Sequence, residues 1–244
     1  MKIGIFLEAD LAKPGGVQEY ARGLYDYLEK TGHQVCLIVP GRVSKEKEKR
    51  RVKSLGKRWE LKKLAWLEGT SVPGAITFAR IGQIKAFLKK ENFAVIHFQA
   101  PFGLLAYQLL WALRQEKTVK VATFHVYRES NLIPFLVNFS VGPFLRWLAR
   151  NLDVKIAVSQ AAQEFSQKMI PGKYVIIPNA VDFSRFHPQG EKIKKFLDAK
   201  LNILFVGRLD SRKGVLPLLQ AFFLVKEKFP AVRLIIVGLS LIHI

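Results

Sequence analysis

Short apolar runs alternate with longer amphipathic stretches over most of the chain. Runs such as Lys2–Leu7 and Gln34–Val39 are apolar at nearly every position, which is typical of strands covered on both faces in a parallel sheet. Stretches such as Val17–Lys30 instead repeat apolar side chains at helical spacing. Strands are predicted at Lys2–Leu7, Gln34–Val39, Ala94–Phe98, Lys120–Phe124, Val154–Val158 and Tyr174–Ile177, and helices at Val17–Lys30, Ile81–Leu88, Leu104–Leu113, Pro134–Asn151 and Ala161–Met169. This alternation predicts an α/β protein with a doubly wound parallel sheet.

The pattern begins again after Asn179–Phe196, a polar and irregular segment that we interpret as a linker. A strand at Asn202–Val206, a helix at Gly214–Phe229 and a strand at Arg233–Val237 follow. A single unit of this kind, about 30 residues long, is too small to bury a stable core. We therefore predict a Rossmann-like domain over residues 1–177, the start of a second, incomplete one over residues 178–238, and a tail at residues 239–244 that is foreign to the natural protein.

The chain is strongly basic, with a formal net charge of +20 over 244 residues. Residues 42–63 hold eleven Lys or Arg against three Glu. A second cluster consists of Arg80, Lys85, Lys89 and Lys90. Such a balance suits a nucleic acid, an anionic membrane surface or a phosphorylated substrate. The alternative is a solvated surface that is kept soluble by its charge.

The single cysteine, Cys36, excludes a disulfide within the chain, so a reducing cytoplasm is the expected compartment. The longest apolar stretch, Leu132–Ala149, is interrupted by Asn, Gly, Pro and Arg, and is predicted to be a core or interfacial helix rather than a membrane span. We expect a cytoplasmic protein that is peripheral at the inner face of the membrane.

Two positions in the first domain are candidates for ligand binding. Gly15 and Gly16 lie where the first strand turns into a helix, and such a turn allows a close backbone approach to an anion at the helix N-terminus. The spacing departs from G-x-G-x-x-G, which disfavours a dinucleotide site, and a plain tight turn is the alternative. His125 follows the strand Lys120–Phe124, at the edge where open α/β sheets bind ligands. A structural histidine is the alternative there.

The second domain opens with a basic turn. Arg208 leaves the end of a strand, and Lys213 lies at the start of the next helix. Two cations beside a helix N-terminus suit a diphosphate whose negative charge grows as it departs. The order Lys-Gly excludes a Walker loop, which needs Gly-Lys, and surface charge is the alternative.

These segments together resemble a known family. The resemblance rests on Pro14-Gly15-Gly16-Val17-Gln18, Ala122-Thr123-Phe124-His125, Ile156-Ala157-Val158-Ser159, Ile177-Pro178-Asn179-Ala180-Val181-Asp182 and Val206-Gly207-Arg208 with Lys213-Gly214. The chain is similar to glycosyltransferase family 4 over residues 1–238, and most like the bacterial phosphatidylinositol mannosyltransferases. The resemblance implies the GT-B fold, which has two Rossmann-like domains.

The resemblance also implies a reaction and a set of roles. A hexose, mannose or glucose, is moved with retention of configuration from a nucleoside-diphosphate sugar to a lipid-linked or glycan acceptor, without a metal or other cofactor. Gly16, Arg208 and Lys213 would bind the donor diphosphate, His125 would be the catalytic residue that contacts the sugar, and Gln18 would contact the acceptor. The second basic cluster, Arg80, Lys85, Lys89 and Lys90, would dock on the membrane.

The chain departs from the family pattern in two places. Ala180 replaces the commoner glycine after Asn179, and the glutamate pair that binds donor sugar and ribose is absent. The chain as written is therefore expected to lack half of its donor site and to be inactive by itself. The competing interpretation is a non-catalytic basic protein that binds membrane or nucleic acid. Nucleic acid is disfavoured because it leaves the Gly-Arg and Lys-Gly turn unexplained, and because only Trp59 and Trp66 interrupt the basic stretch.

Overall fold

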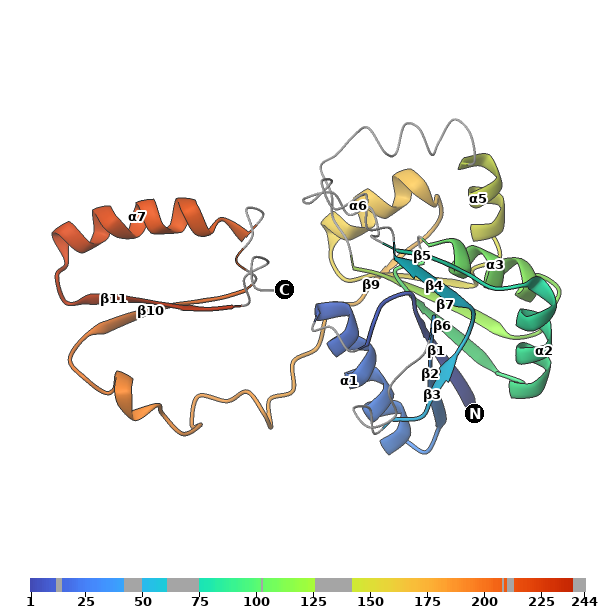
Figure 1. Ribbon diagram of the computed structural model, residues 1–244, viewed down its shortest axis with the longest axis horizontal. Helices are drawn as coiled ribbons and strands as arrows, with labels where there is room; N and C mark the ends of the chain where they lie inside the picture. Colours follow the sequence, from blue (N-terminus) through green and yellow to red (C-terminus); the bar gives the residue numbers. More distant parts are fainter. Residues whose placement is uncertain are drawn as a thin grey trace. The chain divides into compact units, whose positions relative to one another are not determined.

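A computed structural model of the protein describes residues 1–11, 15–41, 50–60, 75–101, 103–125, 142–207, 209 and 213–238. The chain divides into two compact units, of which the first ends at Ala180 and the second begins at Val181. The sequence-based boundary lies between residues 177 and 178. Figure 1 shows that each unit has its own sheet.

The first unit is built on a seven-stranded sheet in the order β3-β2-β1-β6-β7-β8-β9. Every pairing in it is parallel, and the strands are β1 (Lys2–Leu7), β2 (Gln34–Val39), β3 (Val52–Ser54), β6 (Val95–Gln99), β7 (Val119–Phe124), β8 (Val154–Ala157) and β9 (Val175–Ile176). The chain order reverses between β1 and β6, and ligands bind beyond the carboxyl ends of the strands at such a reversal. The predicted doubly wound parallel sheet is confirmed.

Helices cover both faces of this sheet (Figure 1). They are α1 (Gly16–Lys30), α2 (Ile81–Glu91), α3 (Leu104–Leu113), α5 (Gly142–Ala149) and α6 (Gln160–Met169). Alternate residues of β1 enter different cores, because side chains point to opposite faces of a strand. Ile5 and Leu7 pack in one core beneath α1, whereas Phe6 lies in the other with Phe98 of β6, beneath α2, α3 and α5. Each large apolar side chain buried in this way contributes roughly 1.5–3 kcal/mol.

The second unit contains two parallel strands, β10 (Leu201–Val206) and β11 (Val232–Val237), joined through α7 (Val215–Lys228). This is the predicted strand–helix–strand arrangement. A short 3-10 helix, Lys194–Phe196, precedes it. Arg233 of β11 forms an ion pair with Asp198 and lies 5.4 Å from the centre of the Phe196 ring, so the segment before β10 is tied to β11.

Three strands were not predicted. They are β3 and the antiparallel pair β4 (Lys57–Glu60) and β5 (Ala75–Phe78). β3 and β4 lie within the basic residues 42–63, where no strand was predicted, but Lys and Arg on a sheet edge are compatible with strands. The predicted helix Pro134–Asn151 is described only as α5, since residues 134–141 lie outside the described residues, as do residues 239–244.

Candidate functional site

The candidate site of the first unit lies at the carboxyl ends of β1, β6 and β7. The register of the sheet pairs Leu7 with Gln99 and Gln99 with Thr123. Because side chains alternate along a strand, Gln99 and Thr123 lie on the same face as Leu7, which is the face covered by α1. His125 follows β7 two residues after Thr123 and therefore continues this row.

Two histidines lie in this row. The Nε2 atom of His125 is 2.8 Å from Oε1 of Gln99, and Nε2 of His97 is 2.7 Å from the hydroxyl oxygen of Thr123. Burial lowers the pKa of each imidazole to about 4, and the charge of His125 adds to the effect on His97. Both rings are therefore neutral at pH 7. An amide oxygen can only accept, so His125 carries its proton on Nε2 and offers Nδ1 as an acceptor.

Gln99 is a site residue that the sequence interpretation missed. Its side chain is 1% exposed, and its Nε2 has no hydrogen-bond partner among the described residues. The next residue, Ala100, has a φ of +50°, which is rare for a residue other than glycine, and its N–H donates to the carbonyl of Thr123 at 2.8 Å. Unpaired buried groups and unusual backbone concentrate at functional sites. The available signal was the polar His97 and Gln99 within an otherwise apolar strand.

The glycine turn begins α1 beside this row. Gly15 is the N-cap residue and is packed so closely on the side-chain amide of Gln18 that a Cβ there would clash. A Cβ on Gly16 would meet no described residue within 4 Å, so the backbone at Gly16 is open to approach from that part of the structure. The first N–H groups of a helix have no partner within it and favour an anion.

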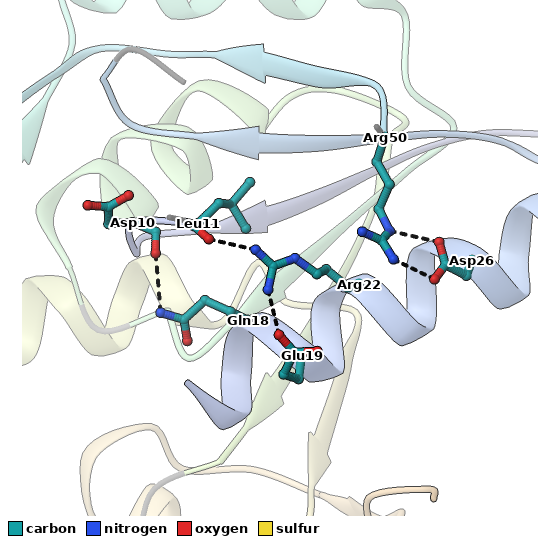
Figure 2. Close-up of polar contacts among 7 residues, drawn as sticks. All are labelled: Asp10, Leu11, Gln18, Glu19, Arg22, Asp26 and Arg50. Atoms are coloured by element: carbon teal, nitrogen blue, oxygen red, sulfur yellow. Dashed lines mark hydrogen bonds and ion pairs between the residues drawn. The ribbon is translucent and has the colours of Figure 1, made fainter. Parts of the chain in front are cut away.

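Side chains of α1 hold the segment after β1 in place (Figure 2). Gln18 donates from Nε2 to the carbonyl of Asp10 at 3.3 Å. Arg22 donates to the carbonyl of Leu11 at 2.6 Å and to the carboxylate of Glu19 at 2.5 Å. The start of α1 and the end of β1 are therefore fixed to each other.

Tyr20 links the glycine turn to the histidine. Its ring meets that of His125 edge to face, with 4.7 Å between the ring centres. The structure thus brings His125 against the first turns of α1, which also carry Gly16 and Gln18. The catalytic, diphosphate-binding and acceptor-binding roles given to these three residues stay predictions.

Glu8, just beyond β1, serves to join three elements. Its carboxylate accepts from the Thr77 hydroxyl of β5 and, at 3.3 Å, from the N–H groups of Leu105 and Ala106 at the start of α3. It lies so close to Gly103 that a Cβ there would clash with it. These contacts satisfy the helix N-terminus with a negative charge.

The predicted membrane-docking residues lie on α2. Arg80 is its N-cap residue, and the exposed Lys85, Lys89 and Lys90 follow along the helix. The apolar residues on and just before this helix mostly face the core: Ile84 and Leu88 are buried and Phe87 packs against it, while Phe78 at the end of β5 and Ile81 are exposed. The helix therefore presents cations without a continuous apolar stripe, and its docking role stays a prediction.

The basic turn of the second unit is described in part. Lys213 is exposed and precedes Gly214, the N-cap residue of α7, whose φ of +68° favours glycine. Arg208 lies outside the described residues. Among the residues that the structure describes, no group of three or more His, Cys, Asp or Glu could hold a metal ion. No helix in the described part of the chain is long and apolar enough to cross a bilayer.

Comparison with curated proteins finds relatives over nearly the whole chain. The phosphatidyl-myo-inositol mannosyltransferase of Mycobacterium tuberculosis is 28% identical over 248 residues, which cover 98% of this chain and 60% of that protein. The alpha-monoglucosyldiacylglycerol synthase of Streptococcus pneumoniae is 24% identical over 265 residues, covering 98% of this chain and 56% of that protein. The chain thus spans about 60% of the length of the curated relatives that it matches.

Solved structures and a family model agree with these relatives. A glycosyltransferase from Rickettsia africae ESF-5 matches with a TM-score of 0.64 at 17% identity, over 97% of this chain and 68% of that one. An alpha-glucosyltransferase in complex with UDP matches with a TM-score of 0.54 at 16% identity, over 96% and 58%. At identities this low, the structural similarity shows the fold alone, and it confirms the predicted GT-B fold. The model of Glycosyltransferase Family 4 matches residues 14–185, and the chain belongs to this family.

Proposed function

We propose that this chain is part of a retaining glycosyltransferase that moves a hexose, mannose or glucose, from a nucleoside-diphosphate sugar to a lipid acceptor. Membership of the family supports glycosyl transfer. The names of the two relatives, a phosphatidyl-myo-inositol mannosyltransferase and a monoglucosyldiacylglycerol synthase, support a lipid acceptor and one of these two sugars. The alpha-glucosyltransferase with bound UDP supports a nucleotide-sugar donor.

The observation that carries the proposal is the neutral His125 at the carboxyl edge of the sheet, against the start of α1. Glycosyl transfer builds positive charge on the sugar ring in its transition state. A neutral imidazole does not repel this charge, and its Nδ1 can accept a hydrogen bond from a sugar hydroxyl. A histidinium at the same place would oppose the reaction.

The remaining roles follow from charge and access. Arg208 and Lys213 neutralise the diphosphate as it leaves, and the open backbone at Gly16 lets a phosphate approach the positive end of α1. Gln18, beside that turn, contacts the acceptor. These groups need no metal ion or other cofactor to balance the charge of the leaving diphosphate. The acceptor lipid places the reaction at a membrane, and we propose its cytoplasmic face.

The test is a transfer assay. Because the chain spans about 60% of its relatives, it is joined after Gly238 to the corresponding C-terminal part of the mycobacterial relative. This chimaera is incubated with labelled GDP-mannose or UDP-glucose and with vesicles that contain phosphatidylinositol or diacylglycerol. We expect label in the lipid fraction with one donor, and an unchanged anomeric configuration by NMR. A folded chimaera that labels no lipid with either donor would refute the proposal, and a salt-sensitive shift of duplex DNA by the chain would favour the nucleic-acid alternative.

His125 is tested within the same assay. His125→Asn is expected to lower turnover at least tenfold while the melting temperature falls little, because the proposed partner of the ring is the sugar. The control is His187→Asn, since His187 is exposed in the second unit. If His125→Asn mainly lowers the melting temperature and activity per folded molecule is retained, His125 is a structural residue.

A further inference from the structure

Three aromatic side chains from two helices form a cluster on the outside of the first unit. Trp111 comes from α3, and Phe144 and Trp147 come from α5. Their ring centres are 6.0 Å apart for Trp111 and Phe144, 5.7 Å for Trp111 and Trp147, and 5.8 Å for Phe144 and Trp147. Phe144 is 51% exposed and Trp147 is 43% exposed. Leu104, seven residues before Trp111 on α3, is also 51% exposed.

Trp111 packs partly against the core, whereas Leu104, Phe144 and Trp147 are exposed and lie outside it. On α3 the core is supplied by Leu105, Leu109 and Leu113, all fully buried, and on α5 by Leu148 and Ala149. Each helix therefore has an inner face in the core and, beside it, apolar side chains that are exposed to solvent: Leu104 on α3, and Phe144 and Trp147 on α5. Removing a large aromatic side chain from water is worth roughly 1.5–3 kcal/mol, so leaving several of them exposed is a cost unless a partner covers them.

The charges around the cluster indicate the kind of partner. The guanidinium of Arg114 lies 3.9 Å from the centre of the Trp111 ring, and Arg150 is exposed just after α5. Helix α3 packs between α2 and α5, so the lysines of α2 belong to the same layer. The only carboxylate on these three helices is Glu91, which is buried and paired with two lysines. Such a surface is apolar and cationic at once, which matches an anionic bilayer.

We infer that the aromatic face, formed by Leu104, Trp111, Phe144 and Trp147, inserts into the headgroup region of an anionic membrane. Indole rings favour this depth because their bodies are apolar and their N–H groups still reach water. Arg114, held over Trp111, meets the lipid phosphates. Helix α2 contributes cations at long range rather than the inserting surface. The inference rests on the proposed function, in which the acceptor is a membrane lipid.

The test measures binding of the chain to vesicles without donor or acceptor. Vesicles of phosphatidylcholine with phosphatidylglycerol are compared with vesicles of phosphatidylcholine alone by co-sedimentation. The variant Phe144→Ser/Trp147→Ser is expected to weaken binding to the anionic vesicles at least tenfold. The control is Tyr27→Ser, since Tyr27 is an aromatic residue on α1, on the opposite face of the sheet, and is even more exposed than Phe144 or Trp147. An unchanged affinity of the double variant, equal binding to both lipids, or loss of self-association in place of loss of vesicle binding would overturn the inference.

A second measurement stands if the double variant fails to fold. Phosphatidylcholine with brominated acyl chains quenches tryptophans that insert near it, and the wild-type chain should lose fluorescence on anionic vesicles that contain this lipid. Trp111→Phe/Trp147→Phe keeps aromatic rings in place and should lose the quenching while it still binds. Quenching that persists in this variant would assign insertion to another part of the chain. Vesicle binding by a chimaera that transfers no sugar would refute the proposed function and leave this inference intact.

Discussion

The two neutral histidines make the first unit sensitive to mild acid. His97 is buried beneath α1, and His125 is partly buried at the end of β7. Burial holds the pKa of each at about 4, compared with 6.5 for an ordinary histidine. Between these two pH values the unfolded chain binds more protons than the folded one. Stability is therefore lost as the pH falls from 6.5 towards 4.

The size of the loss follows from the pKa difference. At pH 5 an unfolded histidine is almost fully protonated, whereas a folded one with a pKa of about 4 is mostly neutral. The interval from the ordinary pKa of 6.5 down to pH 5 is about 1.5 pH units, and over it a fully buried neutral ring loses about 2 kcal/mol of stability. His125 is less buried and contributes less. The pair should lower the free energy of unfolding by roughly 2–4 kcal/mol between pH 7 and pH 5, which is a large share of the stability of a typical domain.

The assay is urea unfolding of the chain at pH 7 and at pH 5, followed by circular dichroism. Other groups also titrate over this range. The informative quantity is therefore the change in the free energy of unfolding between pH 7 and pH 5, compared between each variant and the wild type. His97→Asn should shrink that difference by about 2 kcal/mol, even though it also loses the contact with Thr123. His187→Asn, at an exposed position, should leave it unchanged. A pH difference that is the same in wild type and His97→Asn would refute the assignment of a buried neutral imidazole.

Two further predictions concern charged groups. In the chimaera, Arg208→Ala or Lys213→Ala should each lower turnover at least tenfold, about 1.4 kcal/mol, and near-wild-type transfer by both would remove these cations from the donor site. Burial raises the pKa of Glu91, but its ion pairs with Lys2 and Lys53, both at 2.9 Å, lower it more, so the pKa lies below the ordinary 4.5. Glu91→Gln should therefore lower the free energy of unfolding in urea at pH 7, and this loss should disappear as the pH falls below 4.5. If the variant loses the same stability below pH 4.5 as at pH 7, the ion-pair assignment is wrong.

The central strands were predictable because their burial on both faces produces an apolar run that is visible in the sequence. A strand with a core on each side must be apolar at successive positions, as β1 and β2 are. β3 lies at the sheet edge and has only Val52 as an apolar residue, so it shows no such apolar run. The hairpin of β4 and β5 is likewise hidden, since its pairing joins residues on both sides of a long intervening segment.

The candidate site was predictable only where it depends on local geometry. Gly16 and His125 could be found because a strand-to-helix turn and a strand end are visible in the sequence. Gln99 could not be assigned, because its contact with His125 joins residues 26 positions apart and exists only once β6 and β7 pair in register. Tyr20 lies within the predicted helix Val17–Lys30, but its contact with His125 depends on how that helix lies on the sheet.

Helical periodicity could not separate a core face from a membrane face on α2. The same spacing that predicts an amphipathic surface helix also describes a helix packed on a sheet, and Ile84 and Leu88 are buried in the core. The aromatic face is hidden for a different reason. Trp111 and Trp147 are 36 positions apart, so no window along the sequence holds both, and each helix alone shows only scattered aromatic residues.

The structure separates the cations behind the net charge of +20 into those that are paired within the fold and those that are exposed. Some cations hold the fold together: Lys2 and Lys53 neutralise the buried Glu91, and Arg22 and Arg50 fix chain segments to α1. Removing these residues would destabilise the first unit rather than weaken the binding of a ligand. Only the exposed cations, such as those on α2, remain available to attract lipid or phosphate from solution, because a paired charge is largely cancelled at a distance. Salt should therefore weaken vesicle binding through the exposed cations, while the pairs inside the unit, being less accessible to ions, respond to salt much less.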